Sequence, residues 1–240
     1  MDSIHNQSYK NFEHIVVDGL SRDNTLEIVT NYENVHLISE KDKGQSDAIN
    51  KGFKNAKGDI IAWQNGDDRY LPNTFEHVIN FLNTNTDVDV VYGDYQLIDS
   101  EGNWICDVHP IDWNEWLFKH GRFVPLQPTV FWRRKVLEKT GSLNENLHYC
   151  MDVDYFSRMI LHKFKFARIP KVLGQFRVHQ GSKTQNSDNE RKVKEEHKRV
   201  LSLNFNYGFF DRLIFDFFQF RSDLGKKVKM YSFNKQKIVR

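Results

Sequence analysis

The sequence predicts an α/β fold in which a mostly parallel sheet is flanked by helices and followed by a helical C-terminal extension. Three observations predict this fold class. Short apolar strands alternate with amphipathic helices from residue 11 to about residue 112, which is typical of βαβ units. The helices begin and end at capping signals such as Asp23 and Gly58. From residue 187 the pattern changes to a charged helix and a segment dense in aromatic residues.

The elements follow one another in a regular order along the chain. Apolar and β-branched runs predict strands over residues 14–17, 35–39, 59–63, 88–92, 95–98, 104–108, 129–132 and 172–178. Apolar stripes at helical spacing predict helices from Asp23 to about residue 32 and over residues 45–56, 72–82, 113–120, 133–140, 152–162 and 187–206. The turn Ser100–Asn103 predicts a hairpin between the two strands that flank it.

Length and composition bound the class of protein. The 240 residues suit one large domain with a small appendage, and we place the two at residues 1–186 and 187–240. With 34 basic and 32 acidic residues the net charge is +2, which argues against a nucleic-acid partner. Cys106 and Cys150 are too few for a disulfide framework. No apolar run reaches the roughly 18 residues of a membrane span, so we expect a cytoplasmic protein.

Carboxylates gather at the predicted carboxyl ends of the strands, where open α/β sheets bind their ligands. Asp18 ends the first strand, Asp47 follows the loop after the second, and Asp67 and Asp68 follow the third. Carboxylates crowded at one edge repel one another unless a cation or hydrogen-bond donors lie among them. A hard divalent cation, Mg²⁺ or Mn²⁺, takes oxygen ligands and bridges phosphates, so the pattern favours a site for a metal and a nucleotide.

Each of these residues also has a plain structural interpretation. Residues 65–68 suit a polar turn, Asp18 suits a strand-end turn, and Asp47 suits the solvated face of an amphipathic helix. Asp152 begins a helix, where a carboxylate either caps the helix or acts as a general base. His179 is either a structural histidine or a contact to a diphosphate.

The order of these motifs resembles one known family. The chain contains VVDGLSRDNT, GQSDAINKG, WQNGDDRYLP, VYGDYQLID, QPTVFWRR, LHYCMDVDY and FRVHQGS, in that order, over residues 2–182. Each motif is loose, but the series is similar to the family 2 glycosyltransferases of GT-A fold, particularly bacterial members that build surface polysaccharides. The resemblance implies an inverting, metal-dependent transfer of a sugar from a nucleotide-sugar donor to a glycan or lipid-linked acceptor in polysaccharide biosynthesis.

The resemblance also implies roles for individual residues. Asp152 matches the catalytic base, with Met151 in place of an acid, and Asp67 matches the ligand of Mg²⁺ or Mn²⁺. The remaining positions are implied to bind the nucleotide sugar, most simply a UDP-sugar, and these are Asp18, Asp47, Asn65, Asp68, Gln127 and His179. The second acid that many relatives carry after Asp18 is replaced here by Gly19.

One departure from the family pattern concerns the N-terminus. Relatives begin with an apolar strand, whereas this sequence opens with MDSIHNQSY, which resembles the helix that follows that strand. We therefore expect a GT-A fold without its first strand. The alternative is a degenerate, non-catalytic nucleotide-sugar-binding or scaffold protein. A nucleotidyltransferase is a third hypothesis, and it is disfavoured because no glycine-rich phosphate loop is visible.

The C-terminal segment has two interpretations. Apolar residues recur at helical spacing in residues 209–218, and they are Phe209, Phe210, Leu213, Ile214, Phe217 and Phe218. Lysines follow from Lys226. Either this helix packs on the main domain, or its apolar face contacts the inner face of the plasma membrane while the lysines meet anionic lipid. Asp211, Asp216 and Asp223 interrupt the charge pattern.

Overall fold

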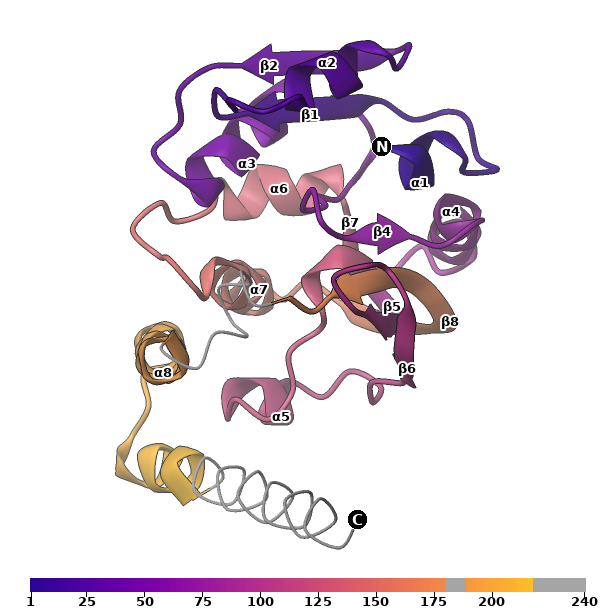
Figure 1. Ribbon diagram of the computed structural model, residues 1–240. Helices are drawn as coiled ribbons and strands as arrows, with labels where there is room; N and C mark the ends of the chain where they lie inside the picture. Colours follow the sequence, from indigo (N-terminus) through magenta and orange to yellow (C-terminus); the bar gives the residue numbers. More distant parts are fainter. Residues whose placement is uncertain (180–188, 218–240) are drawn as a thin grey trace, which may run out of the picture.

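A computed structural model describes residues 1–179 and 189–217 of the chain (Figure 1). Its strands are β1 (His14–Asp18), β2 (Val35–Ser39), β3 (Ile60–Ile61), β4 (Arg69–Tyr70), β5 (Val90–Ile98), β6 (Trp104–Val108), β7 (Phe131–Arg133) and β8 (Phe166–Arg177). Its helices are α1 (Asp2–His5), α2 (Thr25–Thr30), α3 (Gln45–Asn55), α4 (Thr74–Thr84), α5 (Glu115–Lys119), the 3₁₀ helix η1 (Gln127–Thr129), α6 (Arg134–Thr140), α7 (Met151–Leu161) and α8 (Glu190–Phe205).

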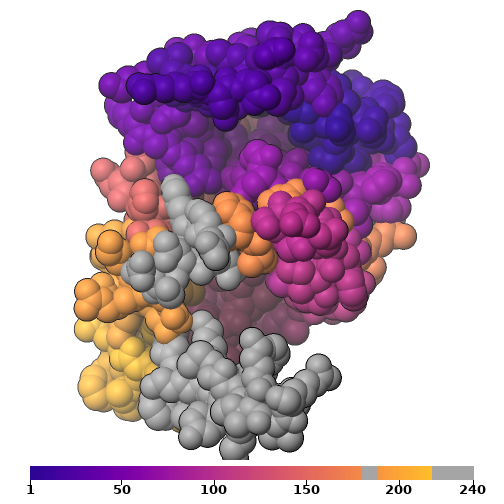
Figure 2. Space-filling model, in the orientation of Figure 1, coloured from indigo at the N-terminus to yellow at the C-terminus, as the bar shows by residue number. Residues whose placement is uncertain are grey.

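The strands form two separate sheets. β1 and β2 pair in parallel, and they lie with α2 and α3 at one end of the molecule (Figure 1). The larger sheet has the order β3-β7-β5-β8-β4, with β6 paired to β5. The space-filling view shows a recess below the indigo layer that contains β1 (Figure 2). The two sheets therefore frame opposite sides of a hollow rather than continuing into one another.

The long strands β5 and β8 form the middle of the larger sheet. They pair in parallel from Val90 with Phe166 to Ile98 with Arg177. Val90 and Val91 are fully buried, which explains why the sequence there is β-branched. Gly93 leaves room for β8, since a Cβ atom there would come within 2.3 Å of the Leu173 side chain. This pair carries the segments that reach the candidate site at its carboxyl end.

The predicted α/β class, with a sheet flanked by helices, is confirmed, and so is the hairpin, since β5 and β6 pair antiparallel. The strand pairing is more mixed than predicted, although the longest strand pair, β5–β8, is parallel. Among the described strands, β1–β2 and β5–β8 are parallel, whereas β3–β7, β4–β8, β5–β6 and β5–β7 are antiparallel. The added pairings come from short strands such as β4 and β7, which tertiary contacts create and local sequence does not mark.

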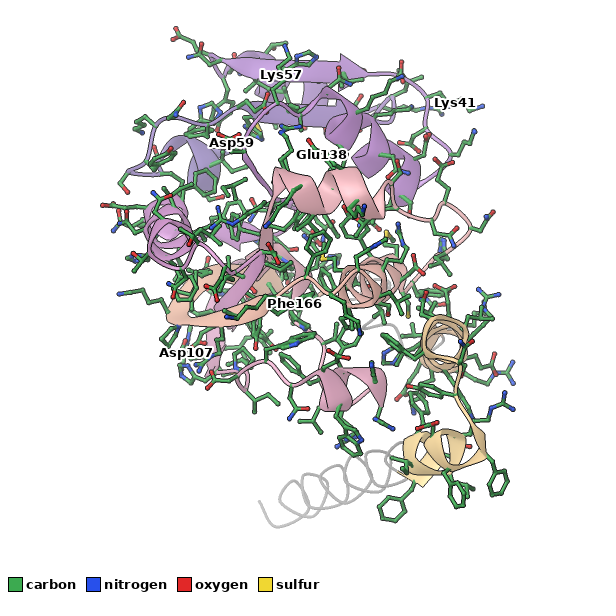
Figure 3. All side chains as sticks on the ribbon, turned by 180° about the vertical axis from the view of Figure 1, so that it is seen from behind. Lys41, Lys57, Asp59, Asp107, Glu138 and Phe166 are labelled. Atoms are coloured by element: carbon green, nitrogen blue, oxygen red, sulfur yellow. The ribbon has the colours of Figure 1, made fainter. Side chains whose placement is uncertain are left out.

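An aromatic core fills the space between the larger sheet and the helices α3, α6 and α7. Phe53, Trp63, Trp132 and Tyr155 pack with ring centroids 5.5–6.1 Å apart. Near the centre of the molecule, Phe166 stacks on Trp113 at 4.0 Å between ring centroids (Figure 3). Many of the 19 Phe, 9 Tyr and 5 Trp residues of the sequence therefore pack the core.

Helix α8 and the residues after it join this same core. Val200, Leu201 and Phe215 are each at most 3% exposed and belong to the cluster that contains Trp132 and Tyr155. The division at residue 186 stays a prediction. None of the helices in residues 1–179 and 189–217 has the length and apolar character to cross a membrane.

Candidate active site

A pocket of about 500 Å³ opens at the carboxyl end of β8, between the loop after β3 and the start of α7. That volume suits a small-molecule ligand. Five of the residues predicted from sequence line it, and they are Asn65, Asp67, Gln127, Asp152 and His179. They come from four distant segments of the chain. The fold therefore brings most of the predicted site residues together around one pocket.

Asn65 organises the loop after β3 through its side-chain amide. Its oxygen accepts a hydrogen bond from Gln45 Nε2 at 2.9 Å, and its Nδ2 donates to Asp68 Oδ2 at 3.2 Å and to Gln127 Oε1 at 3.3 Å. Gln127 is itself buried and donates to the Trp63 carbonyl oxygen at 2.6 Å. These bonds fix a polar floor made from α3, the loop and η1.

Asp67 and His179 lie side by side at the edge of the pocket. His179 Nε2 is 3.1 Å from Asp67 Oδ2, and the Asp67 side chain is 44% exposed. Arg177 holds this loop against β8, because its Nε donates to the Asp67 carbonyl oxygen at 2.9 Å and its Nη1 donates to the carbonyl oxygens of Asp99 and Ser100. Arg177 thus supports the loop, while the Asp67 carboxylate is left accessible from the pocket.

Asp68 has the opposite orientation to its neighbour. It is 6% exposed, and its carboxylate accepts hydrogen bonds from the Arg177 backbone N–H at 3.1 Å and from Asn65 Nδ2. Burial, with a smaller contribution from the negative charge of Asp67, raises the pKa of Asp68 to about 6. Asp68 does not line the pocket and instead supports the loop from beneath.

Asp152 lies in the first turn of α7, on the opposite side of the pocket from the loop after β3. Its Oδ1 accepts a hydrogen bond from the backbone N–H of Val153 at 2.8 Å. Burial, against the effect of that hydrogen bond, raises the pKa of Asp152 to about 6. A carboxylate with a raised pKa in a pocket has the properties of a general base near neutral pH.

Asp18 lies outside this pocket. It is 4% exposed at the end of β1, and it accepts hydrogen bonds from the backbone N–H groups of Leu20 and Ser21 and from the Ser39 hydroxyl. Hydrogen bonding lowers the pKa of Asp18, with the largest contribution from the Ser21 side chain and smaller ones from the Ser39 hydroxyl and the two backbone N–H groups. At the next position, the Asp42 carboxylate occupies the space where a side chain on Gly19 would extend.

Asp47 also lies outside the pocket. Its carboxylate accepts the backbone N–H of Lys43 at 2.9 Å and pairs with Lys51 Nζ at 3.5 Å. It lines a separate pocket of about 430 Å³ between α3 and α6. Asp47 therefore lines a different pocket from Asp67 and Asp152.

Sequence analysis missed several residues that line the pocket. Gln45 comes from the same helix as Asp47 and contacts Asn65, as described above. One wall of the pocket is apolar and consists of Val124, Pro125, Leu126 and Pro128. Another part of the lining consists of His148, Tyr149, Val193 and His197. Gln45 carried no signal of its own, because a glutamine at a helix start is unremarkable. Val193 and His197 could not be anticipated, because α8 follows the family-like motifs, whereas His148 and Tyr149 lie within the motif LHYCMDVDY but were assigned no role.

A divalent cation such as Mg²⁺ needs several oxygen ligands, which protein and substrate supply together. The described residues contain no group of three or more His, Cys, Asp and Glu side chains able to hold a metal. Asp67 and His179 still supply a carboxylate and an imidazole side by side at the pocket. Magnesium and its analogues commonly bind through one or two carboxylates, with substrate phosphates and water completing the shell. Asp67 and His179 fit that arrangement.

Comparison with known proteins places this geometry in a family. The model of the family described as glycosyl transferase family 2 matches residues 1–153. The chain belongs to glycosyl transferase family 2. An uncharacterized glycosyltransferase of Rickettsia typhi is 32% identical over 207 residues, which are 79% of this chain and 62% of that protein. A similar protein of Rickettsia prowazekii is 32% identical over 213 residues, 82% of this chain and 64% of that protein. The chain thus spans less than two thirds of these relatives.

Solved structures of other family-like proteins share the fold. S. aureus TarS 1–349 in complex with UDP-GlcNAc matches with a TM-score of 0.64 and 18% identity, over 85% of this chain and 66% of that one. The mannosyltransferase PcManGT from Pyrobaculum calidifontis, in complex with GDP-Man and Mn²⁺, matches with a TM-score of 0.60 and 16% identity, over 82% and 59%. The predicted family membership and GT-A fold are confirmed.

Proposed function

We propose that this chain is an inverting glycosyltransferase that moves a sugar from a nucleotide-sugar donor, most simply a UDP-sugar, to an acceptor hydroxyl. One observation carries the proposal. Asn65, Asp67, Gln127, Asp152 and His179 line a single pocket of about 500 Å³, although they come from four separate segments. The structural neighbours bound to UDP-GlcNAc and GDP-Man support the choice of donor class.

In this proposal, Asp152 is the general base. Its carboxylate removes the proton from the acceptor hydroxyl, and the hydroxyl oxygen forms a bond to the anomeric carbon of the donor. The bond from that carbon to the diphosphate oxygen breaks on the opposite face, and its electron pair leaves with the nucleoside diphosphate. Inversion at the anomeric carbon follows from the single displacement. The raised pKa of Asp152, about 6, matches the acid–base task.

The polar floor of the pocket is assigned to donor binding. Asn65 and Gln127 are held by hydrogen bonds to one another and present amide groups for hydroxyl and phosphate contacts. Asp67 and His179 would hold Mg²⁺ or Mn²⁺. When bound, the metal neutralises charge on the diphosphate leaving group. His179 also lies close enough to Asp67 to hold its carboxylate in one orientation.

Asp18 and Asp47 have a different part in this proposal. Asp18 ends β1 with its carboxylate bonded inside its own turn, so a nucleoside would contact this turn through backbone groups or Ser21 rather than through a free carboxylate. Asp47 stabilises the start of α3, and Gln45 contacts the donor site in its place.

Substitution of Asp67 tests the metal and donor assignment. Asp67→Ala removes the accessible carboxylate of the loop, so UDP binding in the presence of Mn²⁺ is expected to weaken at least tenfold and release of UDP from UDP-GlcNAc to be lost. Calorimetry with UDP and Mn²⁺ measures binding, and the same titration with GDP compares a second nucleotide. Equal binding and turnover in both proteins would overturn the assignment. Binding of UDP without turnover by the unsubstituted chain would support the non-catalytic alternative.

The C-terminal helix supports a membrane-associated, lipid-linked acceptor. Residues 209–217 are helical, and Phe215 on one side is 1% exposed and packs on His197 and Tyr207. Phe209 and Phe210 are 71% and 75% exposed, and at 100° per residue they lie on the side opposite Phe215. The helix thus combines both interpretations from the sequence, with one face in the core and one facing outward.

Two of the acidic residues that interrupt the charge pattern contact the domain, and they are Asp211 and Asp216. Asp211 caps the Gly208 N–H at 3.0 Å and lies 3.4 Å from His120 Nε2, and Asp216 pairs with Lys198. The lysines from Lys226 onward lie outside the described residues, but their charge suits anionic lipid at about 1 kcal/mol each near a surface. We place this contact at the cytoplasmic face of the plasma membrane, near the pocket wall that His197 lines.

Vesicle flotation tests the membrane contact. The unsubstituted protein is expected to float with phosphatidylglycerol vesicles at low salt, and the double variant Phe209→Ser with Phe210→Ser is expected to lose this flotation. Neither of these two proteins should float with phosphatidylcholine vesicles. Ile28→Ser is the matched control, because Ile28 is 43% exposed on α2 at the opposite end of the molecule (Figure 1). Flotation that the double variant leaves unchanged would contradict the contact. A concentration-dependent dimer that the double variant abolishes, without lipid binding, would assign the face to a second copy.

A further inference from the structure

A single carboxylate on α8 holds the segment that leads into Asp152. Glu196 accepts hydrogen bonds from three consecutive backbone N–H groups, those of His148 at 3.1 Å, Tyr149 at 2.7 Å and Cys150 at 2.8 Å. Its side chain is 12% exposed. Cys150 is the N-cap residue of α7, and no side chain of the segment itself caps that helix. A residue 46 positions further along the chain therefore satisfies the amides at the start of α7.

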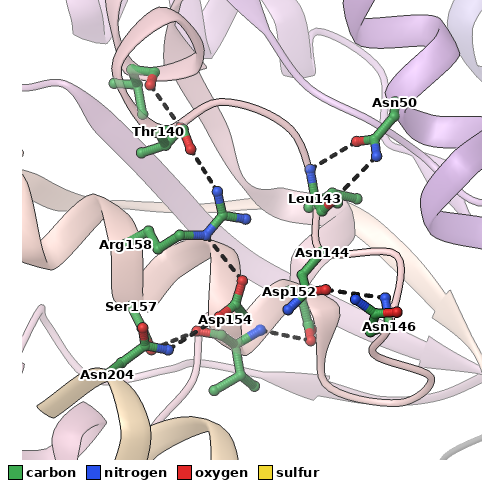
Figure 4. A network of polar contacts seen from close by, with 12 residues as sticks. Asn50, Thr140, Leu143, Asn144, Asn146, Asp152, Asp154, Ser157, Arg158 and Asn204 are labelled. Carbon is green, nitrogen blue, oxygen red and sulfur yellow. Dashed lines mark hydrogen bonds and ion pairs between the residues drawn. The ribbon is translucent and has the colours of Figure 1, made fainter. Parts of the chain in front are cut away.

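Other contacts between the two helices fasten the same segment. The Tyr149 hydroxyl donates to Asn189 Oδ1 at 3.1 Å, and the Cys150 thiol lies 3.7 Å from the Val193 carbonyl oxygen. Further along α8, Asn204 Nδ2 donates to Asp154 Oδ1 at 3.1 Å, in the network that includes Arg158 (Figure 4). Asp152 is thus flanked by contacts to α8 on both its N-terminal and C-terminal sides.

The charge of Glu196 suits its place for two reasons. A carboxylate at the N-terminus of a helix is stabilised by the positive end of the helix dipole. Hydrogen bonds to a charged acceptor are also stronger than those between neutral groups. The same negative charge lies near Asp152, where it adds to the effect of burial in raising the pKa of that carboxyl. The position of Asp152 therefore depends on Glu196, while its pKa is raised mainly by burial, with a smaller contribution from the charge of Glu196.

We propose that Glu196 is a positioning residue for Asp152, which holds the segment 148–150 so that the base faces the acceptor side of the pocket. This inference rests on the proposed role of Asp152. It assigns α8, which follows the residues matched by the family model, to the active site rather than to an appendage. Val193 and His197 of the same helix line the pocket, which agrees with that assignment.

Hydrogen–deuterium exchange tests the geometry without any substrate. The amides of residues 148–150 are expected to exchange slowly in the unsubstituted protein and at least tenfold faster in Glu196→Ala. Glu195→Gln is the matched control, because Glu195 is the neighbouring acid on α8, is 68% exposed and pairs with Arg191. Protection that survives Glu196→Ala would overturn the inference.

The titration of Asp152 distinguishes positioning from a purely structural role. Glu196→Gln keeps the shape of the side chain and removes its charge, so the Asp152 midpoint, followed by carboxyl-carbon NMR and assigned with Asp152→Asn, is expected to move to lower pH. The acid limb of kcat for UDP release from UDP-GlcNAc should move with it. The other titratable groups that line the pocket are Asp67, His148, Tyr149, Cys150, His179 and His197, and all of them are kept in this variant. Arg199 faces Glu196 at 4.0 Å, and the charge of Glu196 also contributes to the raised pKa of the Cys150 thiol, so carboxyl-carbon detection is needed to follow Asp152 alone.

Kinetic constants complete the test. Glu196→Ala is expected to lower kcat by about 10- to 100-fold, the scale of a misplaced catalytic group, with KM for UDP-GlcNAc within twofold. Glu196→Gln should recover part of this loss. A lower melting temperature with unchanged kcat and an unmoved Asp152 midpoint would show a structural role only. If Asp152→Asn itself turns over normally, the proposed base is wrong. If Asp152→Asn is inactive and both Glu196 variants are normal, only the present inference fails.

Discussion

The pocket beside the larger sheet and the small sheet of β1 and β2 contain similar acidic motifs, yet they treat their carboxylates differently. Beside the small sheet, Asp18 accepts hydrogen bonds from its own turn and from β2, and Asp47 on α3 is bonded to Lys43 and Lys51. In the pocket, Asp67 is 44% exposed and Asp152 faces the cavity. A carboxylate that is saturated by backbone donors serves the fold, and one whose oxygens face a cavity is available for chemistry.

The same comparison separates neighbours within each region. Asp68 follows Asp67 directly, but it is buried beneath the loop and bonded to Arg177 and Asn65. Gln45 and Asp47 are two residues apart on α3, which places them on opposite sides of the helix at 100° per residue. The surroundings of each single position, and not the motif as a whole, therefore decide whether a carboxylate is available for chemistry.

Substitution of Asp152 is expected to lower the rate of sugar transfer without weakening UDP binding, which no other acid of the two regions should do. Asp152→Asn keeps the shape of the side chain and removes its basicity, so sugar transfer should fall by about two to four orders of magnitude while UDP binding persists. Kinetics with UDP-GlcNAc and calorimetry with UDP measure the two quantities. Near-normal turnover in Asp152→Asn would place the base elsewhere and remove the main distinction between the two regions.

The pH dependence of the unsubstituted protein supplies the control for that experiment. Because Asp152 acts as a base only when ionised, kcat should decrease as the pH falls through about 6, the raised pKa of this carboxyl. The sign for stability is opposite to that of a salt-bridged acid. A carboxyl whose pKa is raised on folding stabilises the fold at low pH, and this contribution is lost as the pH rises from about 4 to about 6. A kcat that stays constant between pH 5 and pH 7 would contradict the assignment.

Local sequence could predict the elements that local patterns determine. The hairpin of β5 and β6, helix α3 and helix α7 lie within one or two residues of their predicted bounds, except that β5 continues upstream to Val90 as one strand. β4 was missed, because Arg69 and Tyr70 become a strand only by pairing with Gln175 and Gly174 of β8. β3 is shorter than predicted for a related reason, since only Ile60 and Ile61 find partners on β7.

The site was predictable to the extent that its residues follow strands or begin helices. Asp67, Asp152, Gln127 and His179 were named from their motifs, and the structure brings them to one pocket. The direction of Asp47 could not be predicted, because one helical step decides which side a residue faces. Glu196 could not be predicted either, since its role depends on α8 packing against α7, 46 residues away along the chain from Cys150.

The smallest expected effect belongs to Asp47, and it tests the central claim that the donor binds in the pocket of Asp67 and not in the separate pocket that Asp47 lines. Asp47→Ala should lower the melting temperature only slightly, through the lost hydrogen bond from the Lys43 backbone N–H, and thermal denaturation measures it. The deciding measurement is calorimetry of UDP with Mn²⁺ on Asp47→Ala and Asp67→Ala side by side. The account predicts unchanged affinity for Asp47→Ala and at least tenfold weaker affinity for Asp67→Ala. The reverse order would contradict it.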